Sequence, residues 1–173
     1  MLRKIAITGP ESTGKSTLSN QLASHYHCLW VPEFAREYLN NLNRSYGYDD
    51  ILQIAKGQVK LENQAAAASS GFLFCDTEMT VCKIWCEFKY GRVHPWILKQ
   101  LEKQRYDLYL LMDTDLPWQH DPLREHPDKR KQLFDLYRNE LISHYRPFMI
   151  ISGTGEERLQ RAIEVVDNKF NLI

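Results

Sequence analysis

The chain has 173 residues, 43% of them hydrophobic and 25% charged, which fits one soluble globular domain with a single core. Its 22 basic residues balance 22 acidic ones, which argues against nucleic acid as the main partner. No apolar run approaches the roughly 20 residues that span a bilayer, and MLRKIAIT leaves no room for a secretory signal. We therefore expect a cytoplasmic protein that neither inserts into a membrane nor binds nucleic acid.

Short apolar runs alternate with longer amphipathic segments along the chain. The apolar runs predict strands over 4–8, 28–31, 72–76, 107–112 and 148–152. They are apolar throughout, which is typical of strands covered on both faces. The segments between them predict helices over 15–26, 33–41, 49–70, 80–90, 95–103, 128–144 and 156–170. This alternation predicts one α/β domain over 1–173, with a mostly parallel sheet wrapped by helices.

Residues 9–16, GPESTGKS, match the pattern G-x-x-x-x-G-K-[ST] between the first predicted strand and the first predicted helix. Gly9 and Gly14 allow the backbone to turn so that successive N–H groups face phosphate oxygens. The helix start adds its positive end, Lys15 can reach the β- and γ-phosphates, and Ser16 can bind Mg²⁺. We expect a nucleoside triphosphate here, contacted also by Glu11, Ser12, Thr13 and Thr17.

The pattern at residues 9–16 is that of a P-loop. Besides the serine hydroxyl, such a loop requires a carboxylate on the metal side, usually at the end of a neighbouring strand. Two predicted strands end in aspartate, at Asp76 and Asp113. We favour Asp76, because the third strand commonly lies beside the P-loop strand in kinase-type sheets. The alternative role for Asp76 is a cap for the following helix. Asp113 and Asp115 are expected to be loop carboxylates.

The reaction class can be narrowed by what accompanies the P-loop. A GTPase would carry D-x-x-G after its second metal strand and N-K-x-D for guanine. Asp76 is followed by TEM instead, and the only N-K pair, at 168–169, continues FN. A ring-forming ATPase normally needs a helical lid domain and a longer chain. A small-molecule kinase is the class that remains.

Such a kinase needs an acceptor site with a carboxylate that orients or deprotonates the acceptor hydroxyl. The segment VPEFAREYL places Glu33 and Arg36 on one helical face just after the second predicted strand. Glu33 is the preferred base or hydroxyl ligand. The alternative for this pair is an ordinary solvated start of an amphipathic helix.

A kinase also needs a cationic lid to neutralise the transferred phosphoryl group. The segment of about 114–131 is long, rich in proline and charge, and poor in apolar residues, so we expect a mobile lid. Arg124 and Arg130 are its candidate phosphate ligands, with simple surface charge as the alternative. Trp118, among polar loop residues, is expected to stack on the acceptor ring, whereas the helical spacing around Trp85 favours a core position.

The segments GPESTGKSTL, PEFAREYL, IAKGQ, FCDTE, YGRVHP, YDLYLLM and PWQHDPLR follow one another over nearly the whole chain. In this order they resemble the ribosylnicotinamide kinase domain of NadR-type proteins. The resemblance implies a nucleoside-kinase-like P-loop fold with five parallel strands. It also implies transfer of the ATP γ-phosphate, with Mg²⁺, to the 5′-hydroxyl of nicotinamide riboside. By this resemblance, the phosphates and Mg²⁺ would be held by Gly14, Lys15, Ser16 and Thr17. The reacting hydroxyl and the metal would be lined by Glu33, Arg36 and Asp76. Arg124 would belong to the lid, and Trp118 would face the nucleoside pocket.

Two features depart from that family. Its members usually carry an adenylyltransferase domain before the kinase, but no H-x-G-H signature occurs here, so we do not expect that activity. Pro122 stands where the family often has glycine, which would stiffen the lid. Two alternatives stay open: a kinase for another nucleoside or a vitamin-like alcohol, and a regulatory ATP-binding module without a small acceptor. Glu33 and Asp76 both remain candidates for the base.

Overall fold

The computed structural model describes residues 1–172 and contains a five-stranded parallel sheet in the order β2-β3-β1-β4-β5. This confirms the predicted fold class. The strands are β1 (Arg3–Thr8), β2 (Leu29–Val31), β3 (Phe72–Asp76), β4 (Leu108–Met112) and β5 (Phe148–Ile151). Because β1 lies between β3 and β4, the loop that follows β1 emerges between the ends of both neighbours.

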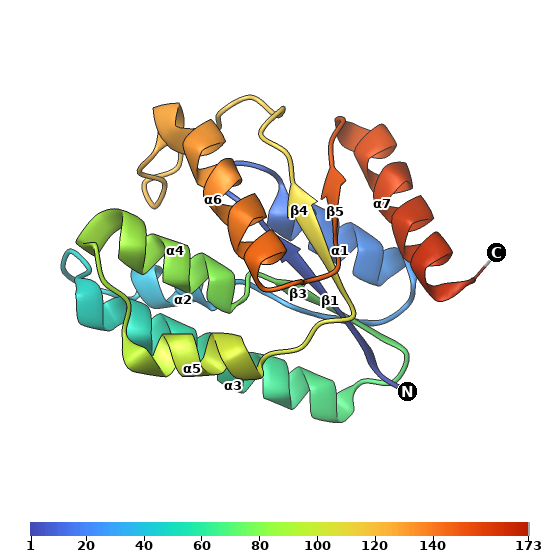
Figure 1. Cartoon of the computed structure of the whole chain (residues 1–173), viewed down its shortest axis with the longest axis horizontal. Coiled ribbons are helices and arrows are strands. Elements are labelled where there is room, and N and C mark those ends of the chain that lie inside the picture. Colours follow the sequence, from blue (N-terminus) through green and yellow to red (C-terminus); the bar gives the residue numbers. More distant parts are fainter. Residues whose placement is uncertain (173) are drawn as a thin grey trace.

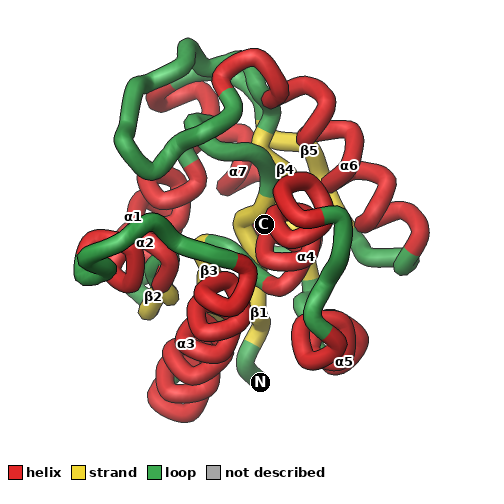
Figure 2. The backbone as a smooth tube through the Cα atoms, turned by 90° about the vertical axis from the view of Figure 1, so that its left-hand side faces the viewer, coloured by secondary structure: helices red, strands yellow, loops and turns green. Residues whose placement is uncertain are grey.

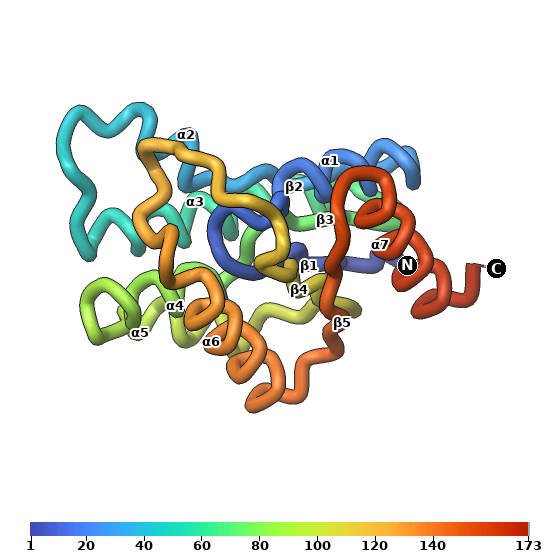
Figure 3. The backbone as a smooth tube through the Cα atoms, turned by 90° about the horizontal axis from the view of Figure 1, so that it is seen from above, coloured from blue at the N-terminus to red at the C-terminus, as the bar shows by residue number. Residues whose placement is uncertain are grey.

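Seven helices and a short 3₁₀ turn surround the sheet in residues 1–172 (Figure 1). The helices are α1 (Lys15–His25), α2 (Phe34–Asn40), α3 (Tyr48–Ala68), α4 (Met79–Tyr90), α5 (Pro95–Lys103), α6 (Arg130–Ser143) and α7 (Gly155–Phe170), and the turn is η1 (Pro127–Lys129). Helices α1 and α7 pack on one face of the sheet, and α3, α4 and α6 on the other. Seen from above, β1 and β4 run between α1 and α6 (Figure 3).

The three central strands form the core, as their continuous apolar runs predict. Ile5 and Ile7 of β1 face α1 and α7, whereas Ala6 faces α4 and α6, and all three are fully buried. The outer strands differ from the prediction that every strand is covered on both faces. Met149 and Ile150 of β5 are 50% and 43% exposed. An edge strand has only one neighbour, and the helices cover the centre of the sheet.

The long loop between β4 and η1 is the segment that differs most from regular structure (Figure 2). It follows the buried β4 and leads into η1 and α6, which begins at Arg130 rather than at 128 because the first turn is 3₁₀. Proline at the start of η1 favours such a turn by fixing one backbone angle. Within residues 1–172 none of the helices combines the length and apolar character needed to cross a membrane.

Candidate active site

The loop after β1 has the conformation that its two glycines allow. Gly9 has φ 129°, and a Cβ there would lie 3.1 Å from the carbonyl oxygen of Met112 at the end of β4. Gly14 has φ 79° in the left-handed region and directly precedes α1. Any other side chain would be strained at both positions. The glycines therefore let the loop turn tightly against the sheet and into the helix.

Side chains hold this loop in place while its backbone N–H groups stay free. The carbonyl of Pro10 accepts hydrogen bonds from Thr13 Oγ1 and Lys15 Nζ, both at 2.7 Å. Arg158, buried on α7, donates to the carbonyl of Thr13 at 2.7 Å. Among the described residues, no hydrogen bond uses the N–H groups of residues 11–17. Free N–H groups beside a helix start form an anion site, so this geometry suits phosphate.

Asp76 ends β3 directly beside the P-loop strand, because it pairs with Ile7 in the register of β1 and β3. It is fully buried, and neither carboxylate oxygen has a hydrogen-bond partner within residues 1–172. Burial, followed by the nearby charge of Glu33, raises the pKa of Asp76 to about 6, and Lys15 acts in the opposite direction. A buried carboxylate without a partner is costly unless a cation joins it. With the Ser16 hydroxyl it offers the oxygen ligands that Mg²⁺ prefers, so these residues fit that ion.

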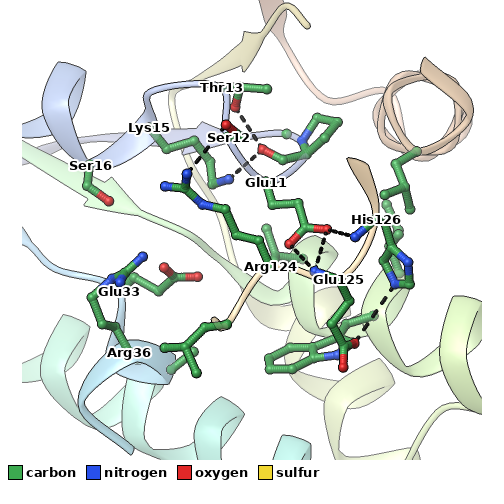
Figure 4. Close-up of a pocket in the computed structure, with 18 of the residues that line it drawn as sticks. Glu11, Ser12, Thr13, Lys15, Ser16, Glu33, Arg36, Arg124, Glu125 and His126 are labelled. Carbon is green, nitrogen blue, oxygen red and sulfur yellow. Dashed lines mark hydrogen bonds and ion pairs between the residues drawn. The ribbon is translucent and has the colours of Figure 1, made fainter. Parts of the chain in front are cut away.

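Glu33 and Arg36 come from the turn between β2 and α2. Glu33 is the residue that precedes the first residue of α2, and Arg36 lies in its first turn. Both side chains line one cavity with Lys15 and Ser16 (Figure 4). Arg36 also forms an ion pair with Asp121 of the β4–η1 loop at 2.9 Å. The end of β2 is therefore linked directly to the segment predicted as a lid.

The β4–η1 loop closes over the P-loop through contacts to its side chains (Figure 4). The Glu11 carboxylate accepts from the backbone N–H of His126 at 2.6 Å and from that of Glu125. Arg124 Nη1 lies 3.4 Å from Ser12 Oγ and also donates to the carbonyl of Gln119. These contacts bring one cationic side chain of the loop to the P-loop.

The cavity has a volume of about 190 Å³ and an aromatic wall opposite the P-loop. Trp85 and Phe88 of α4 and Tyr46 of the α2–α3 loop line it. Trp85 Nε1 donates to the Tyr46 hydroxyl at 3.0 Å, and the two rings meet edge to face with centroids 5.1 Å apart. The hydroxyl of Tyr46 in turn donates to Glu125 of the lid segment at 2.5 Å. The aromatic wall and the lid segment are therefore hydrogen-bonded to each other.

The two tryptophans lie differently with respect to the cavity. Of residues 1–172, those that line the cavity include Trp85 but not Trp118. The Glu11 contacts draw residues 123–126 over the cavity, while Trp118 lies beside Arg130, whose guanidinium carbon is 5.9 Å from its ring centroid. Trp85 packs against a buried cluster, as its helical spacing predicts, and also lines the cavity.

The remaining predicted residues divide between the cavity and its surroundings. The cavity lining includes Gly9, Glu11, Ser12, Thr13, Gly14, Lys15, Ser16, Glu33, Arg36 and Arg124. Three others do not line it. Asp76 is buried at the end of β3, Thr17 is exposed in the first turn of α1, and Arg130 donates to the carbonyls of Ser12 and Leu116.

Comparison with known proteins places the chain in a family. A family model described as an AAA domain matches residues 4–158. The chain belongs to this family. As an AAA-family protein it is also homologous to the trifunctional NAD biosynthesis/regulator protein NadR of Escherichia coli, which is 32% identical over 172 residues. That match covers 95% of the chain but 42% of the relative. The resemblance to NadR-type proteins, predicted from the motifs, is confirmed.

Solved structures of NadR share the fold of this AAA-family chain. A NadR structure described as a complex with NR has a TM-score of 0.83 at 22% identity, covering 96% of this chain and 51% of that one. Another, described with NAD and AMP-PNP, has a TM-score of 0.79 at 21% identity, covering 98% and 49%. The chain thus spans about half the length of the NadR chains.

Sequence reasoning missed several residues that build the site. Tyr46 and Glu125 join the aromatic wall to the β4–η1 loop, and Arg158 binds a P-loop carbonyl 145 positions away in the chain. Tyr46 lies in a short polar loop without a recognisable motif. For Arg158, the only local signal is an arginine three residues after Gly155 in a predicted helix, which does not distinguish a structural arginine from a surface one.

Proposed function

We propose that this chain is an ATP-dependent kinase that phosphorylates the 5′-hydroxyl of nicotinamide riboside, giving nicotinamide mononucleotide and ADP. The observation that carries the proposal is one cavity that joins the P-loop to Glu33 and to an aromatic wall. The P-loop end suits a triphosphate, and the aromatic end suits a planar ring. The homologous NadR and its NR complex support this choice of acceptor.

A carboxylate and an aromatic side chain on one cavity lining suit a cationic ring. The nicotinamide ring of the proposed acceptor carries a positive charge. Trp85 and the Glu33 carboxylate lie on the lining of this cavity, whereas Tyr46 and Glu125 already contact the ammonium group of Lys89. An aromatic face binds a cation through its quadrupole, and a nearby carboxylate adds to that attraction. This combination supports nicotinamide riboside rather than an uncharged nucleoside.

The proposed mechanism divides the work among groups of this chain. The free P-loop amides and Lys15 hold the β- and γ-phosphates, while Glu33 accepts a hydrogen bond from the acceptor hydroxyl and orients it. Mg²⁺, held by Ser16 and Asp76, would neutralise charge on the phosphates. Because Glu33 lines the cavity and Asp76 is buried beneath it, we assign the base role to Glu33.

We also propose that residues 114–131 move as a lid. Arg124 would then bring positive charge to the transferred phosphoryl group, and the closed segment would exclude water. The contacts from Glu11 and Arg36 to this segment support the closed position. Because ATP is a cytoplasmic metabolite, we propose that the protein acts in the cytoplasm, as one P-loop kinase domain over 1–173.

A panel of acceptors tests the function. The protein is incubated with ATP and Mg²⁺ and with nicotinamide riboside, adenosine, cytidine, deoxyadenosine or thymidine, and ADP formation is measured above the rate without acceptor. We expect the highest kcat/KM with nicotinamide riboside and no stimulation when Mg²⁺ is chelated. A preference for another nucleoside would show that the protein is a kinase but that its acceptor is not nicotinamide riboside. Stimulation by no acceptor would favour a regulatory ATP-binding module.

Replacing Glu33 by glutamine tests the base. We expect kcat to fall by roughly 10²–10⁴-fold, because the amide cannot accept the proton. The Kd for ATP should stay within about twofold, since Glu33 makes no part of the P-loop. Glu37→Gln, an exposed site one turn further along α2, is the matched control and should leave kcat unchanged. A Glu33→Gln protein with altered stability but normal kcat would show that Glu33 is an ordinary residue at the start of a helix and not the base.

Replacing each tryptophan by alanine tests whether the aromatic wall binds the acceptor. Trp85→Ala should raise the KM for the acceptor roughly 5- to 150-fold, because stacking of a base on an aromatic side chain contributes about 1–3 kcal/mol. The KM for ATP should change little. Trp118→Ala is the comparison variant, and its acceptor KM should resemble that of the original protein. The opposite ranking of the two variants would restore the assignment made from the sequence.

A further inference from the structure

A buried glutamine of α3 spans the gap between the two strand ends that carry the proposed reaction residues. Gln58 is 1% exposed. Its Oε1 accepts from the backbone N–H of Phe34 at 2.8 Å, and its Nε2 donates to the carbonyl of Pro32 at 3.3 Å. The same Nε2 donates to the carbonyl of Asp76 at 3.3 Å. One side chain therefore binds both residues that flank Glu33 and the backbone of Asp76.

The sheet itself cannot make this connection. The ladder between β2 and β3 ends at the pair Val31 and Cys75. The residue that follows β2 is Pro32, which has no N–H and cannot extend the ladder. Beyond that point the carbonyl of the buried Asp76 needs another donor, because buried backbone carbonyls are normally paired, and the carbonyl of the exposed Pro32 lies within reach of the same donor. The amide of Gln58 supplies a donor to both.

The chain just after Asp76 needs such support. Thr77 has φ 76°, a left-handed conformation that is rare for a β-branched residue and costs free energy. Its N–H donates to the carbonyl of Ile7 at 3.1 Å, and its carbonyl accepts from Gln58 Nε2 at 3.5 Å. These two bonds hold the turn that directly follows Asp76.

Gly57 is what lets α3 come close enough for this contact. A Cβ at Gly57 would lie 2.1 Å from the ring of Phe34, the first residue of α2. Only glycine allows the two helices this approach. Gly57 therefore allows the close contact between α3 and α2, and the next residue, Gln58, makes the hydrogen bonds across it.

We propose that Gln58 is a positioning residue that sets the separation of Glu33 from Asp76. The inference rests on the proposed function, because it concerns the residues to which that function assigns the acceptor hydroxyl and Mg²⁺. Gln58 lies outside the cavity lining among the described residues, so it acts through the backbone of its neighbours rather than on a ligand. Misplacement of a reacting group by about 1 Å can cost on the order of 100-fold in rate.

Two variants test the proposal. Gln58→Leu removes both the donor and the acceptor, and Gln58→Glu keeps the shape and the acceptor but removes the donor to the carbonyls. Each should lower kcat with nicotinamide riboside by about 10- to 100-fold. The Kd for a non-hydrolysable ATP analogue without metal should stay within about twofold, because P-loop contacts do not involve Gln58. The gain in analogue affinity on adding Mg²⁺ should fall by roughly tenfold.

A matched control separates positioning from stability. Tyr106 is also buried, and its hydroxyl donates to Glu62 at 2.5 Å at the opposite end of the sheet. Tyr106→Phe should lower Tm. It should leave unchanged both kcat and the gain in affinity for the ATP analogue on adding Mg²⁺, here called the Mg²⁺ gain. If both Gln58 variants behave in the same way as Tyr106→Phe, Gln58 only stabilises the fold and the inference is wrong. If the original protein phosphorylates no acceptor, the proposed function fails, whereas the Mg²⁺ gain still decides the role of Gln58.

Discussion

Replacing Lys15 by alanine is expected to lower kcat for phosphoryl transfer by about 10²–10³-fold, the usual cost of losing one preorganised group that stabilises the transition state. Lys15 is the first residue of α1, and within residues 1–172 its Nζ donates only to the carbonyl of Pro10. That bond keeps the ammonium at the P-loop, where it can move to the β- and γ-phosphates. Steady-state ADP formation with saturating acceptor measures the change.

A control variant that loses another lysine shows whether the effect is specific to Lys15. Lys60→Ala removes an exposed lysine from α3 and should leave kcat unchanged. The Tm of the Lys15→Ala protein should fall only slightly, because a partly exposed hydrogen bond contributes about 1 kcal/mol. Near-normal phosphoryl transfer by folded Lys15→Ala would contradict the assignment of residues 9–17 as the phosphate site.

Replacing Asp76 by asparagine is expected to abolish most activity and to stabilise the protein that lacks nucleotide and metal. Burial holds the pKa of Asp76 at about 6, above the ordinary value of 3.8. The folded protein thus favours the protonated carboxyl. The contribution of this one group to the free energy of unfolding is therefore greatest below pH 3.8 and is lost as the pH rises through 6. At pH 7.5 the ionised group therefore costs stability that asparagine avoids. We expect a gain of about 1–2 kcal/mol at that pH, since the buried amide also lacks partners.

Unfolding by urea at two pH values tests this expectation. The difference in the free energy of unfolding between Asp76→Asn and the original protein should be largest at pH 7.5 and smaller at pH 4.5. Asp113→Asn, which changes a carboxylate just after β4, serves as the control for the loss of one carboxylate. Assays with Mg²⁺ and acceptor should show loss of kcat. A variant that is less stable at both pH values, or that keeps its activity, would overturn the assigned metal role.

The sequence alone predicts the P-loop because its glycines, lysine and hydroxyl residues lie within nine consecutive positions. Gly9, Gly14 and Lys15 have fixed spacing between an apolar strand and a helix, and no distant contact is needed to recognise them. The order of apolar and amphipathic segments likewise predicted the parallel α/β sheet. The position of Asp76 followed from the same reasoning, since parallel strands end at one edge of the sheet.

The tertiary structure decided the rest of the site, because its parts come from separate elements. The apolar face of α4 that includes Trp85 and Phe88 has the spacing of a buried helix face, yet in the structure it forms the cavity wall. Spacing along a helix shows which residues share a face, but not whether another element or a ligand covers it. The Gln58 bridge and the Arg158 support depend on contacts 18 and 145 residues apart, so only the packed chain reveals them.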